Sequence, residues 1–145
     1  MATERHASVT WNGDLMSGSG TIDDVGSGAF GPLDVSWAAR SEEASGGKTS
    51  PEELIAAAHA SCFSMALAHG LAQAGSAPER LQTSATVTFV PGTGITAIAL
   101  AVRATVPGLD EAGFREAAEA AKAGCPVSKA LAGVPEITLD AQLAG

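Results

Sequence analysis

Hydrophobic and polar residues alternate along three parts of the chain, which predicts β-strands. The first forty residues contain short alternating runs separated by glycines, such as SVTWNGDLMSGSGTI and GPLDVSWAAR, and predict an antiparallel meander of about three strands. The run SATVTFVPGTGITAIALAVRATV predicts a hairpin that turns at residues 91–94. One face of its second strand carries Thr96, Ile98, Leu100, Val102, Ala104 and Val106. The last run, EITLDAQL, predicts a closing strand.

A long helix is predicted to begin at Ser50 and to end near Ala74, after a loop at 41–49 that is rich in Gly, Ser and charge. Ser50 is a good N-cap, Pro51 suits the first helical position, and Glu53 can close a capping box. Apolar residues occur on every face of this helix, unlike the pattern of a surface helix. We therefore expect it to be the central element of the fold, enclosed by protein.

Two further helices are predicted before the last strand. The run DEAGFREAAEAAKAG is amphipathic, with acidic residues in its first turn and Lys122 in its last, and it ends at Gly124. The run CPVSKALAG predicts a short helix that begins at Pro126. No repeat or linker interrupts the chain, so we expect a single α+β domain over residues 1–145.

The composition changes this picture in one respect, the size of the core side chains. Apolar residues make up 46% of the 145 residues, but aromatic residues make up only 4% and Tyr is absent. The core must therefore be built largely from Ala, Val, Leu and Ile. Because small side chains fill volume poorly, burial against a second subunit is an attractive source of further stability.

The charge and the N-terminal sequence limit the expected partners and location. Eight basic against sixteen acidic residues give a formal net charge of -8, which disfavours nucleic acid as a partner. The N-terminal MATERHASVTW has no apolar signal segment, and no run of eighteen or more strongly apolar residues follows. We expect a cytoplasmic location without a membrane. In a reducing compartment, two cysteines are typically free, metal-binding or redox-active.

The two cysteines differ in their predicted surroundings. Cys125 lies between a helix end and a helix start, where free N–H groups favour a thiolate, so on the residues alone it is the better nucleophile. Cys62 lies about three turns inside its helix, where burial raises the pKa of a thiol, and a structural role is the simpler interpretation. To be reactive it needs a cation, and Arg40 and Lys48 are the only basic residues over 7–78.

Several motifs together resemble those of the OsmC/Ohr family of thiol-dependent peroxidases. They are TSPEELIAAAHASCFSMAL, TVPGLD, AGCPVSKAL and EITLDAQL, in this order along the chain. The early run TWNGDLMSGSGTI is more similar to the OsmC branch than to the organic hydroperoxide resistance branch. The resemblance covers nearly the whole chain. It implies an OsmC-like α+β fold, with antiparallel sheets around a long central helix, in an intertwined homodimer.

The resemblance also implies a reaction and a site. Cys62 would be the peroxidatic residue that reduces an organic hydroperoxide, or hydrogen peroxide, and becomes a sulfenic acid. Cys125 would resolve it into a disulfide, which a dithiol such as a protein-bound lipoyl group would reduce. Arg40 would hold the thiolate and orient the peroxide, and Glu52 would position Arg40. No metal, haem or flavin cofactor is implied.

The spacing of Glu52 and Cys62 has a geometric consequence. The two residues are ten positions apart in one predicted helix, so they lie about 15 Å apart along its axis. A glutamate cannot cover this distance within one chain. Glu52 must therefore act through Arg40 or come from a partner subunit, and the resemblance favours the partner subunit.

Two alternatives follow from the same residues. His59 and Cys62 form an i, i+3 pair, and with His69 they suggest a metal site. However, His69 lies about 10.5 Å from Cys62 along the helix axis, which is too far for a shared ion. His59 is then better explained as a hydrogen-bonded core residue. The second alternative is a non-catalytic dimer that binds a small apolar ligand, and the presence of both cysteines argues against it.

Overall fold

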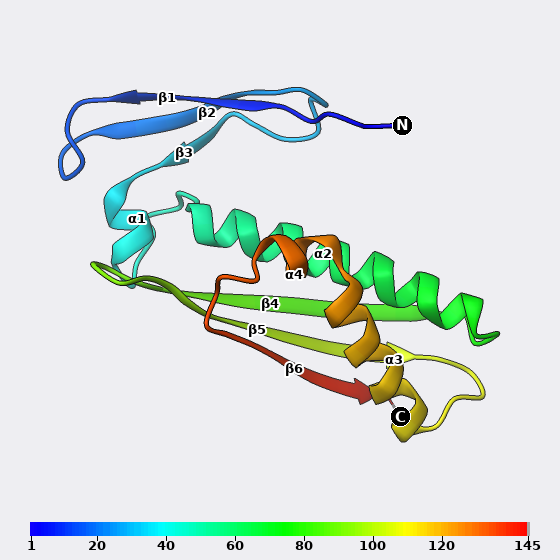
Figure 1. Cartoon of the computed structure of the whole chain (residues 1–145). Helices are drawn as coiled ribbons and strands as arrows, with labels where there is room; N and C mark the ends of the chain where they lie inside the picture. The colour runs from blue at the N-terminus through cyan, green and yellow to red at the C-terminus, as the bar shows by residue number, and fades with distance from the viewer. Residues whose placement is uncertain (145) are drawn as a thin grey trace. The chain divides into compact units, whose positions relative to one another are not determined.

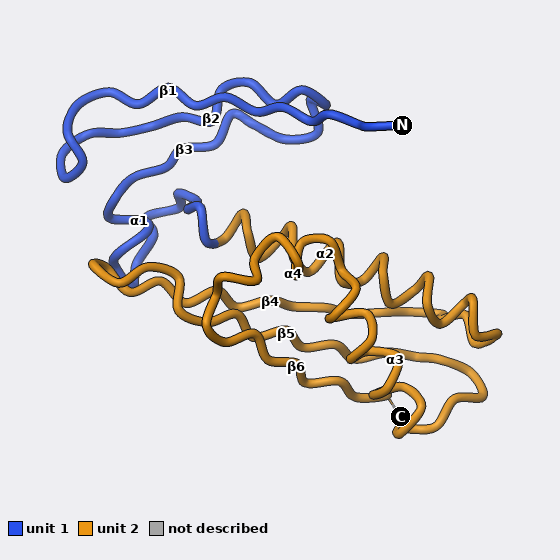
Figure 2. The backbone as a smooth tube through the Cα atoms, in the orientation of Figure 1, with its two compact units in different colours: residues 1–52 blue, residues 53–145 orange. Residues whose placement is uncertain are grey.

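The computed structural model describes residues 1–144. These residues form two compact units. Unit 1 comprises Met1–Glu52, and unit 2 begins at Glu53 and extends to the C-terminal end of the chain (Figure 2). Each unit has its own three-stranded sheet.

Unit 1 is an antiparallel meander followed by a short helix (Figure 1). Strands β1 (Ala7–Asn12), β2 (Ser19–Val25) and β3 (Leu33–Val35) pair in chain order, as the sequence predicts. The next residues form helix α1 (Trp37–Ser41), in which Arg40 lies. The run GPLDVSWAAR, which the sequence analysis assigned to the meander as far as Arg40, is therefore a strand only at Leu33–Val35 and a helix from Trp37.

The start of α1 has a clear local cause. The side-chain oxygen of Ser36 accepts a hydrogen bond from the backbone N–H of Ala39 at 3.1 Å, which makes Ser36 an N-cap. Ala38 and Ala39 lie within this helix and have a high helix propensity.

The sheet of unit 2 contains strands β4 (Arg80–Val90), β5 (Gly94–Thr105) and β6 (Glu136–Leu143) in this order. Strands β4 and β5 form the predicted antiparallel hairpin. Strand β6 pairs with β5 in parallel, so the prediction of purely antiparallel sheets is wrong at this pair. The cause is the connection. The chain passes through helices α3 (Glu111–Gly124) and α4 (Pro126–Ala130) before it begins a strand parallel to β5.

Helices α2 (Pro51–Gln73) and α3 lie over one face of the sheet of unit 2 (Figure 1). The buried residues of β5 are those of the predicted apolar face, from Ile98 to Ala104, with Val106 just beyond the strand. Helix α3 contributes Phe114, Ala118 and Ala121 to the same core. Most of these side chains are small, as the composition requires.

Helix α2 begins and ends close to the predicted positions, but only one stripe of it is buried in the chain. The stripe recurs at every fourth residue and consists of His59, Phe63, Leu67 and Leu71. On another face Met65 is 72% exposed. The chain alone therefore does not enclose this helix as predicted. The length and apolar composition of α2 would also suit a membrane span, as is true of many core helices of water-soluble proteins.

Candidate active site

Cys62 lies in the middle of α2, directly before the buried Phe63. Its position on the helix is one residue away from the fully buried stripe, so its side chain packs against the core while part of it remains exposed. The thiol is free. Cys62 is thus the more accessible of the two cysteines.

Cys125 is fully buried at the junction between α3 and α4. Its backbone N–H donates to the carbonyl of Ala121 at 2.8 Å, which ends α3, and its own carbonyl accepts from the N–H of Lys129 at 3.1 Å, which begins α4. Pro126 stands at the first helical position of α4 and needs no hydrogen-bond partner for its nitrogen. The helix end and the helix start predicted from the sequence therefore meet at Cys125, as expected.

The two thiols form a hydrogen bond to each other, although they belong to elements far apart in the sequence. Burial raises the pKa of Cys62, and the hydrogen bond with Cys125 raises it further. Burial alone would raise the pKa of Cys125 as well. However, hydrogen bonds from the side chains of Cys62 and Ser128 and from the N–H groups of Val127 and Ser128 outweigh it, and the pKa of Cys125 is lowered. Within the described chain, the surroundings therefore favour the thiolate form at Cys125 over that at Cys62.

Arg40 and Glu52, both in unit 1, form an ion pair. The Nε–H group of Arg40 donates to both carboxylate oxygens of Glu52, at 3.0 and 3.2 Å. The side chain of Glu52 is only 8% exposed, and that of Arg40 is 33% exposed. These charge-assisted hydrogen bonds to a nearly buried carboxylate restrict the orientation of the guanidinium.

His59 is a hydrogen-bonded core residue, as the sequence predicts. It is fully buried, and its Nε2 atom lies 2.7 Å from Oγ of Ser128. Sequence reasoning did not single out Ser128, which stands three residues after Cys125 in the first turn of α4. The CPVS motif could have indicated Ser128, because a Ser three residues after the helix N-cap can donate a hydrogen bond to the N-cap residue.

Over residues 1–144 no group of three or more His, Cys, Asp and Glu side chains could hold a metal ion. His69 is exposed, and it lines a hollow that does not include Cys62. The metal alternative therefore has no set of ligands in the part of the chain that the structure describes.

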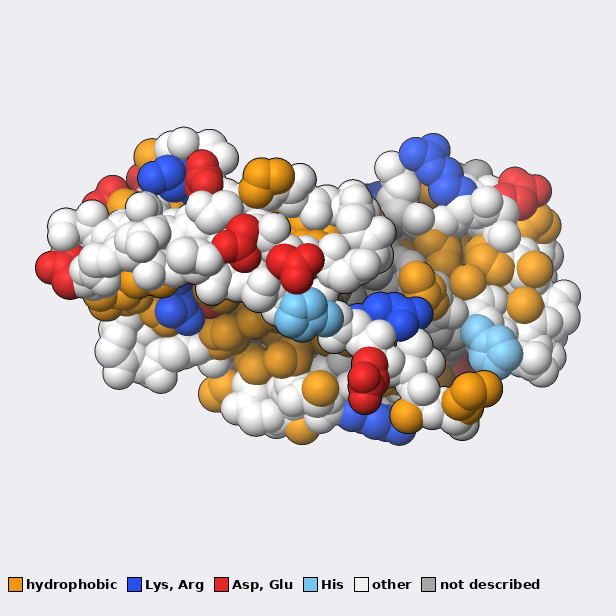
Figure 3. Space-filling view, turned by 90° about the horizontal axis from the view of Figure 1, so that it is seen from above, with side chains coloured by type: hydrophobic (Ala, Val, Ile, Leu, Met, Phe, Trp, Pro, Cys, Tyr) orange, Lys and Arg blue, Asp and Glu red, His pale blue; other side chains and the backbone are white. Residues whose placement is uncertain are grey.

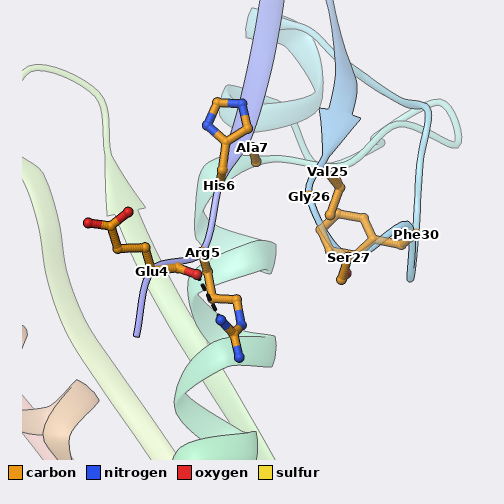
Figure 4. A pocket seen from close by; sticks show the side chains of 8 residues that line it. All are labelled: Glu4, Arg5, His6, Ala7, Val25, Gly26, Ser27 and Phe30. Atoms are coloured by element: carbon orange, nitrogen blue, oxygen red, sulfur yellow. Dashed lines mark hydrogen bonds between the residues drawn. The ribbon is translucent and has the colours of Figure 1, made fainter. Parts of the chain in front are cut away.

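Two surface hollows, one in each unit, have no candidate catalytic residue among their lining residues. The hollow of unit 1 lies between the N-terminal segment and the turn after β2, where Arg5 donates to the carbonyl of Glu4 (Figure 4). Nearly all of its lining residues are exposed. The hollow of unit 2 has a volume of about 560 Å³ and lies between α2 and α3. It is lined by Ala66, His69, Gly70, Ala74, Gly113, Glu116, Ala117, Ala120, Ala121 and Gly124.

The α+β fold and the paired thiols agree with the family that the sequence resembles. The chain belongs to the OsmC family, since the profile of the OsmC-like protein family matches residues 44–140. It is 42% identical over 146 aligned positions to Peroxiredoxin OsmC of Escherichia coli (strain K12), and the alignment covers 99% of both chains. This identity supports the prediction of a peroxidase.

Two solved structures extend the likeness to the fold. The OsmC-like protein of Mycoplasma pneumoniae has a TM-score of 0.75 at 16% identity, with 100% of both chains covered. The organic hydroperoxide resistance protein OhrB of Bacillus subtilis has a TM-score of 0.61 at 26% identity, with 96% of this chain and 98% of that chain covered. The OsmC-like α+β fold predicted from the sequence is confirmed.

Proposed function

We propose that the protein is a thiol-dependent peroxidase that uses Cys62 and Cys125. Its proposed substrates are organic hydroperoxides and also hydrogen peroxide. The observation that carries this proposal is the hydrogen bond between two free thiols on different elements of unit 2. Such a pair can form a disulfide without a large rearrangement. The name of the E. coli relative, a peroxiredoxin, and that of the B. subtilis structure, an organic hydroperoxide resistance protein, support the same chemistry.

In the first step, the thiolate of Cys62 attacks one oxygen of the hydroperoxide. An S–O bond forms, the O–O bond breaks, and the leaving alkoxide takes a proton and departs as the alcohol. Cys62 is thereby oxidised to a sulfenic acid. The solvent exposure of the two cysteines supports Cys62 as the residue that reacts with peroxide, because Cys62 is partly exposed whereas Cys125 is fully buried. A peroxide from solvent therefore reaches Cys62 first.

In the second step, the thiolate of Cys125 attacks the sulfur of the Cys62 sulfenic acid. An S–S bond forms, the S–O bond breaks, and the hydroxide takes a proton and leaves as water. A dithiol then reduces the disulfide by thiol–disulfide exchange and is itself oxidised to a disulfide. We propose a protein-bound lipoyl group as this dithiol. No metal or organic cofactor takes part in any of these steps.

The pKa directions explain why this scheme needs a cation. Burial and the contact with Cys125 both raise the pKa of Cys62, so Cys62 alone is a poor thiolate at neutral pH. We propose that Arg40 supplies the positive charge to Cys62 and orients the peroxide, and that Glu52 positions Arg40. Their ion pair supports this assignment, because it holds the guanidinium in a defined orientation.

We further propose that the functional unit is a homodimer in the cytoplasm. The uncovered apolar face of α2, with Met65 at its surface, supports a protein partner for this helix. A second copy also agrees with the separation of Glu52 and Cys62, which stand ten positions apart on α2. The buried His59 and the packing of one stripe on the sheet distinguish α2 from a helix surrounded by lipid.

The charge of the protein supports small molecules and proteins rather than nucleic acid as partners. The net charge is -8. On the face drawn in Figure 3, Lys and Arg side chains stand in separate small groups among acidic and neutral ones. A nucleic-acid site would need a continuous basic surface.

Mass spectrometry of the protein after addition of one equivalent of an organic hydroperoxide tests the proposed peroxidase. The expected product has lost the mass of two hydrogen atoms, and peptide mapping should find a Cys62–Cys125 disulfide. Cys62→Ser is the matched control, and it should remain unoxidised on the same timescale. A protein that stays unchanged, as a non-catalytic ligand-binding dimer would, contradicts the proposal.

A further inference from the structure

His59 is the only buried histidine of the described chain, and its environment is unusual for a core position. It stands in the apolar stripe of α2, four residues before Phe63. Its Nε2 atom contacts Oγ of Ser128 at 2.7 Å, and over residues 1–144 its Nδ1 atom is a buried polar atom with no hydrogen-bond partner. Burying an imidazole is unfavourable unless its polar atoms are satisfied. A purely apolar side chain would serve packing at lower cost.

Ser128 connects this histidine to Cys125. The hydroxyl and the backbone N–H of Ser128 are both hydrogen-bond partners of the Cys125 thiol. The same hydroxyl oxygen lies beside His59. Helices α2 and α4 therefore meet through a chain of three side chains, which are His59, Ser128 and Cys125.

The number of protons in this chain fixes its direction when Cys125 is a thiolate. A thiolate has no proton and can only accept. Ser128 has one hydroxyl proton and donates it to the sulfur of Cys125, so its oxygen must accept from the Nε2–H of His59. Burial lowers the pKa of His59, which keeps the ring neutral with one proton to donate.

We propose that His59 is a positioning residue for the resolving step, which acts through Ser128 to direct a hydroxyl proton at Cys125. Without His59, the hydroxyl of Ser128 can rotate away from the sulfur. With His59 in place, the hydroxyl is held toward Cys125 and stabilises its thiolate. This inference rests on the proposed role of Cys125 as the resolving thiol, but its central claim concerns only the ionisation of Cys125.

The first experiment measures the thiolate of Cys125 by ultraviolet absorbance against pH in a Cys62→Ser background, where it is the one thiol. His59→Met keeps the volume and removes the donor, and Ser128→Ala removes the hydroxyl. At pH values below the pKa of Cys125, each substitution should lower the thiolate fraction about three- to tenfold, as expected for the loss of one hydrogen bond. The double variant should lose no more than either single variant, because both remove the same chain.

Conservative variants separate positioning from packing. His59→Gln retains an N–H donor and Ser128→Thr retains a hydroxyl, so each should restore most of the thiolate. His69→Gln changes an exposed histidine of the same helix and serves as the control. An unchanged thiolate fraction in a folded His59→Met variant would overturn the proposal, as would an effect of Ser128→Ala with none of any His59 variant. If His59→Met does not fold, His59→Leu, which also lacks a donor, takes its place in the comparison with His59→Gln.

The second experiment follows a single turnover of the protein with both cysteines intact. His59→Met should slow the conversion of the sulfenic acid to the disulfide about three- to tenfold and leave sulfenic acid formation unchanged. Slowing of the first step instead would contradict the assignment to resolution. If no sulfenic acid forms even in the unmodified protein, the proposed peroxidase fails, whereas the absorbance experiment still tests the role of His59.

Discussion

The Nε–H group of Arg40 donates to both carboxylate oxygens of Glu52, at 3.0 and 3.2 Å. The pair joins helix α1 to the first turn of α2, two elements separated by the loop at 42–50. The carboxylate is nearly buried and is a charged partner of the guanidinium. Its removal would therefore take away a strong, fixed contact of Arg40. The orientation of Arg40 therefore depends on Glu52.

Removal of either partner should slow the reaction with peroxide. We expect Glu52→Gln to lower kcat/KM for an organic hydroperoxide about tenfold, because it keeps the shape and loses the charge-assisted hydrogen bond. Arg40→Met should lower it about a hundredfold or more, and Arg40→Lys should not restore it, since an ammonium cannot reproduce the fixed fork of a guanidinium. Steady-state kinetics with a lipoyl dithiol measures these effects.

Arg40→Met should also raise the pKa of Cys62, because the proposed cation is lost. The pKa is measured from thiolate absorbance in a Cys125→Ser background. Lys48→Met is the control, since Lys48 is the one other basic residue over 7–78. A shift in the Lys48 variant with none in the Arg40 variant would reassign the cation.

Cys125→Ser should separate the two chemical steps. The variant is expected to consume about one equivalent of hydroperoxide and then to stop, because Ser128 and His59 cannot replace a resolving thiol. Mass spectrometry should find the mass of one added oxygen atom on Cys62, or of two or three after excess peroxide. Continued turnover with the dithiol would mean that the reductant attacks the sulfenic acid directly and that Cys125 is dispensable.

Acid should destabilise the protein through His59. Below about pH 6.5 the unfolded chain binds a proton at this residue, whereas burial lowers the pKa in the folded chain and delays protonation. Because the unfolded state then binds more protons, the free energy of unfolding falls with decreasing pH, by at most about 1.4 kcal/mol per pH unit. This loss begins near the unfolded-state pKa and ends at the lower folded-state pKa.

The test compares urea midpoints at about pH 7.5 and about pH 5.5, on either side of the ordinary pKa of histidine, at one protein concentration. His59→Gln cannot titrate, so the difference between its two midpoints should be smaller than in the unmodified protein. His69→Gln replaces an exposed histidine of the same helix and serves as the matched control. An identical pH dependence in the His59 variant would contradict the prediction.

Substitution on the uncovered face of α2 should weaken the proposed dimer. Met65→Glu would bury an unpaired charge at the interface, which costs at least about 2 kcal/mol and weakens association about thirtyfold or more. Light scattering coupled to size-exclusion chromatography measures the change. Met16→Glu is the matched control, because Met16 is 74% exposed in the turn between β1 and β2 while Met65 is 72% exposed. If Met65→Glu leaves the oligomeric state unchanged, sedimentation with lipid vesicles would test lipid as the alternative partner of this face.

Local sequence signals predicted most elements of the fold. The Ser50–Pro51 start of α2, the turn at 91–94 and the acidic start of α3 each act over a few residues, and the structure has an element boundary at each. The order of strands is a different matter. No local pattern in the sequence indicates which strand pairs with β6. Its parallel pairing with β5 follows from the route of the chain through α3 and α4.

The site was predicted in part, for the same reason. The motifs around Cys62 and Cys125 singled out both thiols, and the contact between them emerged only from the fold. Arg40 was singled out as a candidate from the sequence but was expected at the end of a strand, because the cap at Ser36 was overlooked. The contact of His59 with Ser128 joins residues 69 positions apart, which no local pattern can reveal.

The parallel return of β6 also links the completion of folding to chemistry. The crossover between β5 and β6 is the segment that carries Cys125, and the carboxylate of Glu111 at its start accepts from the N–H of Leu143 at the end of β6. During synthesis, Cys62 leaves the ribosome long before this final strand does. On the proposed roles, a nascent chain that has not yet reached Cys125 has an oxidisable thiol without its resolving partner. We therefore expect the protection of Cys62 against irreversible oxidation to depend on the packing of this crossover against α2.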